Sequence, residues 1–301
     1  MIRHVIVTGA GGRIGSAVVR ELRDHGIRTT GLVVEGTSPA DDTLLGDAGD
    51  PRAVDRAITH ALDHSPVAEV GIAHLAAIPS PGEGLAEEVF GNNTAATFAV
   101  LEAAGRAGIG RAVIASSVSV LGFAWGSADL RPHYLPMDEQ HPVLAEDPYA
   151  LSKWVDECTT VMMHRRWGTT IVALRLPFVA DGERLAARQR EAAADPAALR
   201  AELWGWLHTD DAGRAFRLAL TAPTSRATTI TVTAPESLSD VPTADLLRTY
   251  LPDVPTREEL PDRTVPYDLT RAREILGFTA RRRLVRSTPI TASESLQKGT
   301  T

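Results

Sequence analysis

Short apolar runs alternate with amphipathic stretches along the first two thirds of the chain. The first run, His4–Val7, is rich in β-branched residues and does not alternate with polar positions. Such a run is typical of a strand that is buried on both faces of a parallel sheet. Glycines follow it, and then apolar residues recur at helical spacing from Ile14 to Leu22 until Gly26 ends the pattern. The opening segment therefore predicts a strand, a glycine-rich turn and a helix.

The same alternation continues to about residue 176. Further strands are predicted at 28–34, 44–47, 70–75, 112–115, 171–176 and 228–233, and helices at 51–62, 85–107, 149–167, 183–203 with a break at 195–196, 244–250 and 269–276. Alternating strands and helices predict an α/β fold built on a doubly wound parallel sheet. Ligands bind such sheets at the carboxyl ends of the strands. Those ends carry Gly9, Asp47, Ala76, Ser117 and Pro177.

The pattern loosens after residue 176. We therefore divide the chain into a nucleotide-binding sheet domain, 1–176, and a region 177–301 that is mainly a small substrate lobe, with some segments returning to the sheet. Within the second region, Asp210 and Asp211 are expected to be the N-cap pair of a helix that ends at Leu220.

The glycine-rich turn contains three glycines at a regular spacing of three, Gly9, Gly12 and Gly15. Glycine lets the backbone approach a phosphate closely, and the N-terminus of the following helix offers free N–H groups. Three glycines alone are a weak signal, but here a strand precedes them and a helix follows. The turn therefore predicts a binding site for the diphosphate of a dinucleotide.

The end of the second strand bears on the choice between NAD and NADP. An acidic residue there would bind the ribose 2′-hydroxyl of NAD. The expected position holds Val33, and Glu35 stands two residues later. The acid is thus either displaced or absent, and Arg13 in the glycine loop could meet the 2′-phosphate of NADP. The sequence favours NADP slightly.

Tyr149 and Lys153 stand four residues apart on a predicted helix, one turn from each other on the same face. A phenol has a pKa near 10, and a neighbouring ammonium lowers it, which makes the phenol useful as a general acid or base. The chain holds only two lysines, Lys153 and Lys298, and otherwise uses arginine. Because lysine has a shiftable pKa and arginine does not, the choice at position 153 indicates chemistry.

Composition excludes several classes of function. The net charge of −7 and the absence of arginines interleaved with aromatics argue against a nucleic-acid partner. No apolar run approaches the length of a membrane span, and no signal peptide precedes His4, so we expect a cytoplasmic protein. The single cysteine, Cys158, excludes an internal disulfide and a cysteine-rich metal site, and we expect its thiol to be buried.

Several motifs in their order along the chain carry a family resemblance. They are Thr8-Gly9-Ala10-Gly11-Gly12-Arg13-Ile14-Gly15, Asp47, His74-Leu75-Ala76-Ala77, Asn93, Ser116-Ser117 and Tyr149-x-x-x-Lys153. Together they resemble the extended short-chain dehydrogenase/reductase family, which includes the NAD-dependent epimerases and dehydratases. The resemblance covers roughly residues 3–220 and implies a Rossmann-type sheet.

The resemblance also implies roles for individual residues. Ser117 would hydrogen-bond the substrate oxygen, Tyr149 would carry its proton, and Lys153 would lower the pKa of Tyr149 and hold the nicotinamide ribose. The residues implied for NAD(P) binding are Gly9, Gly12, Arg13, Ile14, Gly15, Glu35, Asp47, Ala48, Leu75, Ala76, Ala77, Asn93, Tyr149, Lys153, Pro177 and Val179. His74 is expected to be a packing residue. Candidate substrate contacts are Ser80, Ser119, Phe123 and Tyr134.

One departure concerns the substrate. Sugar-nucleotide enzymes of this family commonly carry an asparagine after the sixth strand, where this chain has Phe178, and no arginine-rich diphosphate clamp stands out in the C-terminal part. These differences favour a small sugar or a partly apolar substrate without a nucleotide.

The preferred hypothesis is an NAD(P)-dependent oxidoreductase that transfers a hydride between nicotinamide and a secondary alcohol or ketone. The alternative is a sugar-nucleotide epimerase or dehydratase with tightly bound NAD. A cofactor sensor without catalysis is a weaker hypothesis, because the chain keeps both Tyr149 and Lys153. The resemblance also implies a homodimer formed through the helices that carry Asn93 and Tyr149.

Overall fold

The computed structural model describes residues 1–127 and 129–284. Its centre is a parallel sheet in the order β3-β2-β1-β4-β5-β6-β9. The strands are β1 His4–Thr8, β2 Arg28–Val33, β3 Asp42–Leu45, β4 Val70–His74, β5 Arg111–Ser117, β6 Thr170–Leu176 and β9 Thr228–Thr231. This sheet confirms the predicted α/β fold of Rossmann type.

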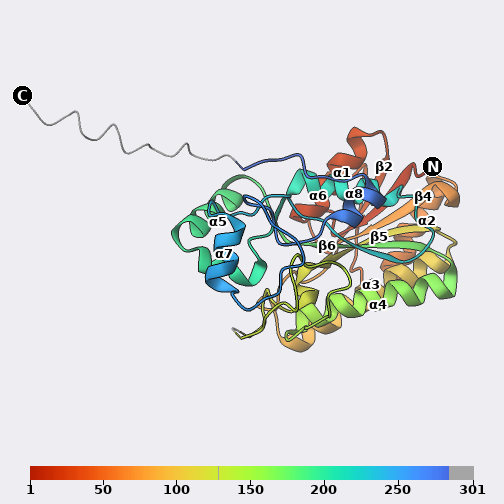
Figure 1. Cartoon of the computed structure of the whole chain (residues 1–301). Helices are drawn as coiled ribbons and strands as arrows, with labels where there is room; N and C mark the ends of the chain where they lie inside the picture. Colours follow the sequence, from red (N-terminus) through yellow and green to blue (C-terminus); the bar gives the residue numbers. More distant parts are fainter. Residues whose placement is uncertain (128, 285–301) are drawn as a thin grey trace, which may run out of the picture.

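Helices cover both faces of the sheet. They are α1 Arg13–Asp24, α2 Pro51–His64, α3 Ala86–Arg106, α4 Pro148–Trp167 and α6 Thr209–Leu220. One apolar core joins the sheet to α1 and α6, and a second joins it to α2, α3 and the Met163 side of α4. Figure 1 shows α1 and α6 above the sheet and α3 and α4 below it. Both faces of each central strand are thus buried, which explains the unbroken apolar runs.

The strand order reverses between β1 and β4, which lie side by side in the sheet. The chain runs from β1 outward to β3 and then crosses back to β4. In the register of the two central strands, Thr8 pairs with His74. A crevice at the carboxyl ends of such a pair is where open α/β sheets bind ligands.

The region after β6 builds a separate small layer and then returns to the sheet. Its elements are β7 Phe178–Ala180, α5 Gly182–Ala194, the 3₁₀ segment Pro196–Glu202, β8 Trp206–His208, α7 Thr243–Tyr250 and α8 Thr270–Leu276. Strands β7 and β8 pair in parallel, apart from the main sheet. Figure 1 shows α5 and α7 together at the end of the molecule opposite α2.

The start of α6 differs from the sequence prediction. The helix begins at Thr209, and the side chain of His208 caps it by accepting a hydrogen bond from Asp210 N at 3.1 Å. Asp210 and Asp211 therefore lie in the first turn rather than at the N-cap. Asp211 instead accepts hydrogen bonds from the backbone of Arg281 at 2.9 Å and of Arg282 at 2.8 Å, which fastens the end of the described chain to α6.

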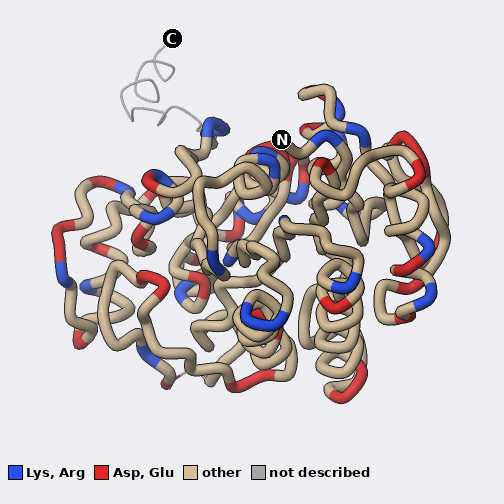
Figure 2. Tube along the Cα trace, turned by 90° about the vertical axis from the view of Figure 1, so that its right-hand side faces the viewer, with Lys and Arg blue, Asp and Glu red and all other residues tan. Residues whose placement is uncertain are grey.

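Charged residues are spread over the outside of the molecule. In Figure 2, acidic and basic positions intermingle, and neither sign covers the visible face. Among residues 1–127 and 129–284, no helix combines the length and apolar character needed to cross a bilayer.

Candidate active site

The glycine loop between β1 and α1 requires glycine for two separate reasons. Gly9 has φ +68°, and a Cβ there would lie 2.8 Å from the backbone nitrogen of Ala76. A Cβ on Gly15 would lie 2.0 Å from the carbonyl oxygen of Gly9. The loop thus packs backbone against backbone and leaves its outer side without side chains.

The N-terminus of α1 can receive a phosphate. Its N-cap is Gly12, which has no side chain to satisfy the first N–H groups of the helix. Arg13 and Ile14 begin the helix, and Arg13 is exposed. This combination of a glycine cradle and free helix N–H groups fits the diphosphate of a dinucleotide such as NAD.

The backbone after β4 lies directly against this loop. Leu75 N and Ala76 N donate hydrogen bonds to the hydroxyl of Thr8, at 3.1 and 3.2 Å. Because both N–H groups already have a partner, Leu75 and Ala76 would meet a cofactor by packing, and Ala77 follows them in the chain. These three contacts stay predictions.

The residues expected near the adenosine lie beyond the ends of β2 and β3. Glu35 and Asp47 are exposed, Ala48 is buried, and Asp47 Oδ1 accepts a hydrogen bond from Gly49 N at 2.8 Å. Val33 is buried at the end of β2 and packs near the glycine loop. The adenosine contacts and the preference for NADP stay predictions.

Ser117, Tyr149 and Lys153 come together at the carboxyl end of β5. The Ser117 hydroxyl donates to the hydroxyl of Ser119 at 2.9 Å. Tyr149 stands in the first turn of α4, which begins at Pro148 and is capped by Asp147, whose Oδ1 accepts from Ala150 N at 2.9 Å. The Lys153 ammonium lies 5.9 Å from the centre of the Tyr149 ring. The predicted trio is therefore assembled by one strand end and one helix start.

The electrostatics of Tyr149 combine opposing causes. Burial raises its pKa, while the charge of Lys153 and a hydrogen bond with Ser117 lower it. Burial outweighs the other two here, so the pKa lies above its ordinary value. The lysine acts in the predicted direction, but in the protein alone it offsets only part of the cost of burying a phenolate.

Asn93 has a role in holding the fold around the site. Its side-chain oxygen accepts from Ile78 N at 2.8 Å, and its amide donates to Ile78 O at 3.0 Å and to Ser152 Oγ at 3.1 Å. The residue thus ties the loop after β4 to the first turns of α4. Ser80 lies in the same loop.

Two buried carboxylates on α4 were not singled out in the sequence. Asp156 Oδ2 lies 3.1 Å from the Lys153 ammonium. Glu157 accepts two hydrogen bonds from Arg175, at 2.9 and 2.8 Å, and one from Ser116 at 2.6 Å. Their positions three and four residues after Lys153 place them one turn further along the helix, and that spacing was the available signal.

The remaining substrate candidates lie on the side of the C-terminal region. Phe123 is buried and lines a cavity of about 230 Å³ together with Leu130, Leu203 and Leu251. The hydroxyl of Tyr134 donates to Asp138 at 2.7 Å. The structure thus places Phe123 and Tyr134 on neighbouring segments, and their contact with a substrate stays a prediction.

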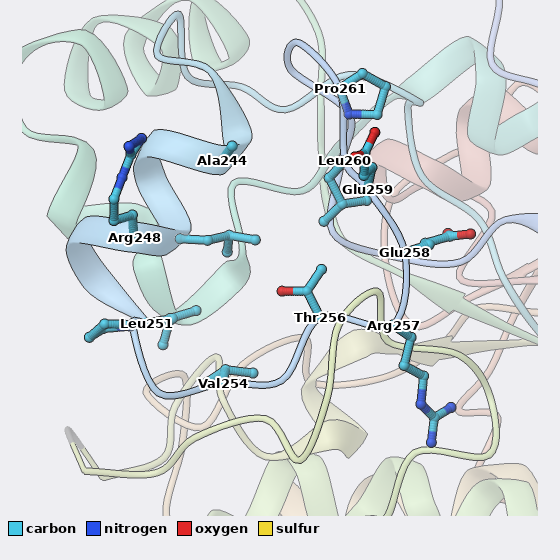
Figure 3. Close-up of a pocket in the computed structure, with 12 residues that line it drawn as sticks. Ala244, Arg248, Leu251, Val254, Thr256, Arg257, Glu258, Glu259, Leu260 and Pro261 are labelled. Atoms are coloured by element: carbon cyan, nitrogen blue, oxygen red, sulfur yellow. The ribbon is translucent and has the colours of Figure 1, made fainter.

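A larger hollow of about 760 Å³ lies between α7 and residues 251–261. Figure 3 shows Thr256 and Leu260 facing α7 across it, while Arg257 extends away, and its guanidinium lies over the Tyr134 ring. None of the predicted substrate residues lines this hollow. Leu251 borders both hollows, so they adjoin.

Pro177 and Val179 follow β6, where they were expected to flank the nicotinamide. Val179 is buried, and Phe178 between them is partly exposed. The guanidinium groups of Arg184 and Arg188, both from α5, lie 5.2 and 5.4 Å from the centre of the Phe178 ring. Two arginines that did not stand out in the sequence therefore flank the position of the missing asparagine.

Apolar side chains are exposed along one side of α4. Leu151, Trp154, Val161 and Met162 are each more than a third exposed, and their spacing places them on one helix face. Cys158 is exposed at the same spacing, so the expectation of a buried thiol was wrong. The homodimer contact stays a prediction, and a contact between two copies through this face would bury its exposed apolar side chains.

A profile of the NAD dependent epimerase/dehydratase family matches residues 5–232. The chain belongs to this family. Its curated relatives include UDP-glucose 4-epimerases from Azospirillum brasilense, 31% identical, and from Rhizobium meliloti, 28% identical. Each alignment covers 51% of this chain, and 42% and 45% of those relatives respectively. The chain therefore matches less than half the length of these epimerases.

Solved structures resemble the chain over nearly its whole length. A short-chain dehydrogenase/reductase superfamily protein from Agrobacterium tumefaciens with bound NAD has a TM-score of 0.69 and 26% identity, and the match covers 93% of each chain. MoeE5 in complex with UDP-glucose and NAD has a TM-score of 0.65 and 26% identity over 93% of this chain and 94% of its own. The family is NAD-dependent, and these structural neighbours bind NAD. The described residues include no group of three or more side chains suited to hold a metal ion.

Proposed function

We propose that the chain is an NAD-dependent enzyme that interconverts sugars by reversible oxidation of a secondary hydroxyl, as UDP-sugar 4-epimerases do. The observation that carries the proposal is the convergence of Ser117, Tyr149 and Lys153 at the edge of the sheet where the glycine loop also lies. The UDP-sugar bound in MoeE5 and the curated epimerases support the substrate class. This comparison favours the epimerase hypothesis over the simple dehydrogenase that the sequence favoured.

The three residues would handle one proton. Tyr149, as the phenolate, takes the proton of the substrate hydroxyl, and Ser117 donates a hydrogen bond to the same oxygen. Lys153 favours the phenolate through its positive charge. The chemistry that NAD would supply when bound is reversible hydride transfer with the carbon that carries this oxygen. Tyr149 keeps the proton while the ketone occupies the site and gives it back when an alcohol forms again.

The arginines on α5 support an anionic substrate. Phe178 holds the guanidinium groups of Arg184 and Arg188 beside the end of β6. Arg188 is already engaged with Glu202 and Glu191. Arg184 is exposed; partial burial and the charges of Arg13 and Arg188 lower its pKa, while the charge of Glu83 raises it. A diphosphate would relieve that repulsion.

A dehydrogenase that releases its oxidised product is the second candidate. One observation favours it. Phe178 stands where sugar-nucleotide enzymes of the family commonly have asparagine. Such an enzyme would bind NAD or NADP weakly enough to exchange it.

One experiment separates the candidates. The purified protein is first assayed for retained dinucleotide, then titrated with NADH and NADPH by fluorescence, and finally incubated with UDP-galactose and followed by proton NMR. An epimerase retains NAD and forms UDP-glucose without net NADH. A dehydrogenase exchanges its cofactor and accumulates NADH with an oxidised sugar, and tighter binding of NADPH would support the role of Arg13.

Tyr149→Phe is the matched variant. We expect it to bind the dinucleotide as before and to lose turnover by about 10²- to 10⁴-fold, because it lacks the group that carries the proton. Undiminished turnover in Tyr149→Phe would refute the assigned role, and failure to bind either dinucleotide would refute the proposed function.

A further inference from the structure

The catalytic lysine is buried together with a carboxylate on its own helix. The Lys153 ammonium donates to Asp156 Oδ2 and to the carbonyl oxygen of Ala115, each at 3.1 Å. The side chain of Lys153 is 4% exposed and that of Asp156 is not exposed at all. Two opposite charges thus lie out of water next to each other, and removing either would leave the other unpaired.

A chain of hydrogen bonds leads from the glycine loop toward Asp156. The Thr8 hydroxyl accepts from Leu75 N and Ala76 N, so its own proton points to His74 Nδ1, 2.7 Å away. Burial lowers the pKa of His74 to about 3, so the ring is neutral and carries its proton on Nε2. That N–H donates to the Thr97 hydroxyl at 3.1 Å.

The Thr97 hydroxyl can then donate its own proton in a hydrogen bond toward Asp156. Burial raises the pKa of Asp156, and the charge of Lys153 and the Thr97 hydroxyl lower it. Asp156 Oδ1 has no partner in full hydrogen-bond geometry within the described part of the chain. The carboxylate is therefore fixed mainly by Lys153, and Thr97 assists from the neighbouring helix.

We propose that Asp156 is a positioning residue that holds the Lys153 ammonium and offsets part of its charge. The proposal rests on the proposed function of Tyr149 as the proton carrier. A lone buried ammonium would attract the phenolate of Tyr149 with its full field, whereas an ammonium paired with a carboxylate attracts it less. With Asp156 in place, Tyr149 consequently ionises at a higher pH than it would beside an unpaired lysine.

The other charged groups around the pair do not replace this effect. On α4, Asp147 faces Tyr149, and Glu157 acts on Lys153 through its charge, less than Asp156 does, while it is bound to Arg175 of β6. From β4, His74 faces Lys153 as a neutral ring. Asp156 is thus the carboxylate that hydrogen-bonds the lysine.

The test is the ionisation of Tyr149 in Asp156→Asn, in which an amide oxygen can still accept from Lys153 while the charge is gone. The protein carries tyrosine labelled with ¹³C at the ring carbon that bears the hydroxyl, and its pH titration is followed by NMR. The chain has four tyrosines, and the spectrum of Tyr149→Phe assigns the relevant signal. We expect the midpoint for Tyr149 to fall by about one pH unit in Asp156→Asn. An unchanged or higher midpoint would overturn the proposal.

Glu157→Gln is the control, because it removes a neighbouring buried carboxylate that does not hydrogen-bond Lys153. This variant should be less stable but should keep the Tyr149 midpoint near its original value. A fall of the midpoint equal to that in Asp156→Asn would mean that the effect is not specific to Asp156, and it would overturn the proposal. If Asp156→Asn does not fold, Asp156→Ser is titrated in its place. The proposal again requires that the Tyr149 midpoint falls.

Activity gives a second readout. The acidic limb of the pH profile of kcat/KM should move in the same direction as the midpoint. If Tyr149→Phe keeps full turnover, the proposed function fails. If Tyr149→Phe is inactive and the Asp156→Asn midpoint does not fall, only the role of Asp156 fails.

Discussion

Buried neutral histidine should make this protein sensitive to mild acid, and His74 allows the effect to be calculated. Burial lowers its pKa from 6.5 to about 3, and both ring nitrogens are hydrogen-bonded. As the pH falls below 6.5, the unfolded chain takes up a proton at His74 and the folded protein does not. The stability that the neutral ring provides is therefore present above pH 6.5 and is lost progressively as the pH falls toward 3.

The size of the effect follows from the two pKa values. Between pH 8 and pH 5 only the unfolded state binds a proton at His74. It does so over the roughly 1.5 pH units below its pKa of 6.5, which lowers the free energy of unfolding by about 2 kcal/mol. Urea unfolding at the two pH values gives the loss for the original protein and for His74→Gln, which cannot take up this proton. We expect the original protein to lose about 2 kcal/mol more than the variant.

Comparing the loss of stability in the original protein with the loss in His74→Gln cancels the contributions of the other groups that titrate. His4, whose pKa burial lowers to about 4, contributes equally to both proteins and cancels. Equal losses of stability in the original protein and in His74→Gln would refute the reasoning, because they would mean that the ring is protonated in the folded state or remains accessible to water.

Three further predictions test other parts of the structure. Glu157→Ala should lower the free energy of unfolding by about 3–5 kcal/mol in urea, because it leaves the guanidinium of Arg175 buried without its carboxylate, and a loss below about 1 kcal/mol would contradict this. Gly15→Ala should weaken NAD binding at least about tenfold by fluorescence titration, since the new methyl would displace the carbonyl of Gly9, and unchanged affinity would mean that the loop adjusts freely. Trp154→Arg should convert a homodimer to a monomer by light scattering, and a monomeric original protein would show the dimer prediction to be wrong.

The parts of the site that depend on local geometry could be predicted from the sequence. Gly15 is required by the close approach of Gly9 within the same loop, and Tyr149 and Lys153 are one helical turn apart. Both patterns can be recognised in the sequence without knowledge of the tertiary packing. Ser117 was named from the family resemblance, and its place at the end of a predicted strand agreed with that choice because ligands bind at the carboxyl ends of parallel strands.

The parts that depend on packing could not be predicted in the same way. Asp156 matters because α4 buries it beside Lys153. A carboxylate on an exposed turn would have the same spacing from the lysine, so the spacing alone could not distinguish the two cases. Strands β7 and β8 are three residues long each, too short for a period, and they form by pairing with each other. The helix α6 has His208 as its N-cap, two residues before Asp210, because a histidine side chain could accept the capping hydrogen bond.

The return of β9 to the sheet changes how this protein could be recombined with its relatives. The chain leaves the sheet after β6 at Leu176, forms β7, α5 and β8, covers the sheet with α6, and re-enters as β9 beside β6. An exchange of substrate specificity by grafting would therefore have to replace segments on both sides of β9, because α5 precedes this strand and α7 follows it (Figure 1). A graft that replaced everything after Leu176 would also remove the strand that covers the edge of β6, and it would leave seven buried residues open to pairing with another chain.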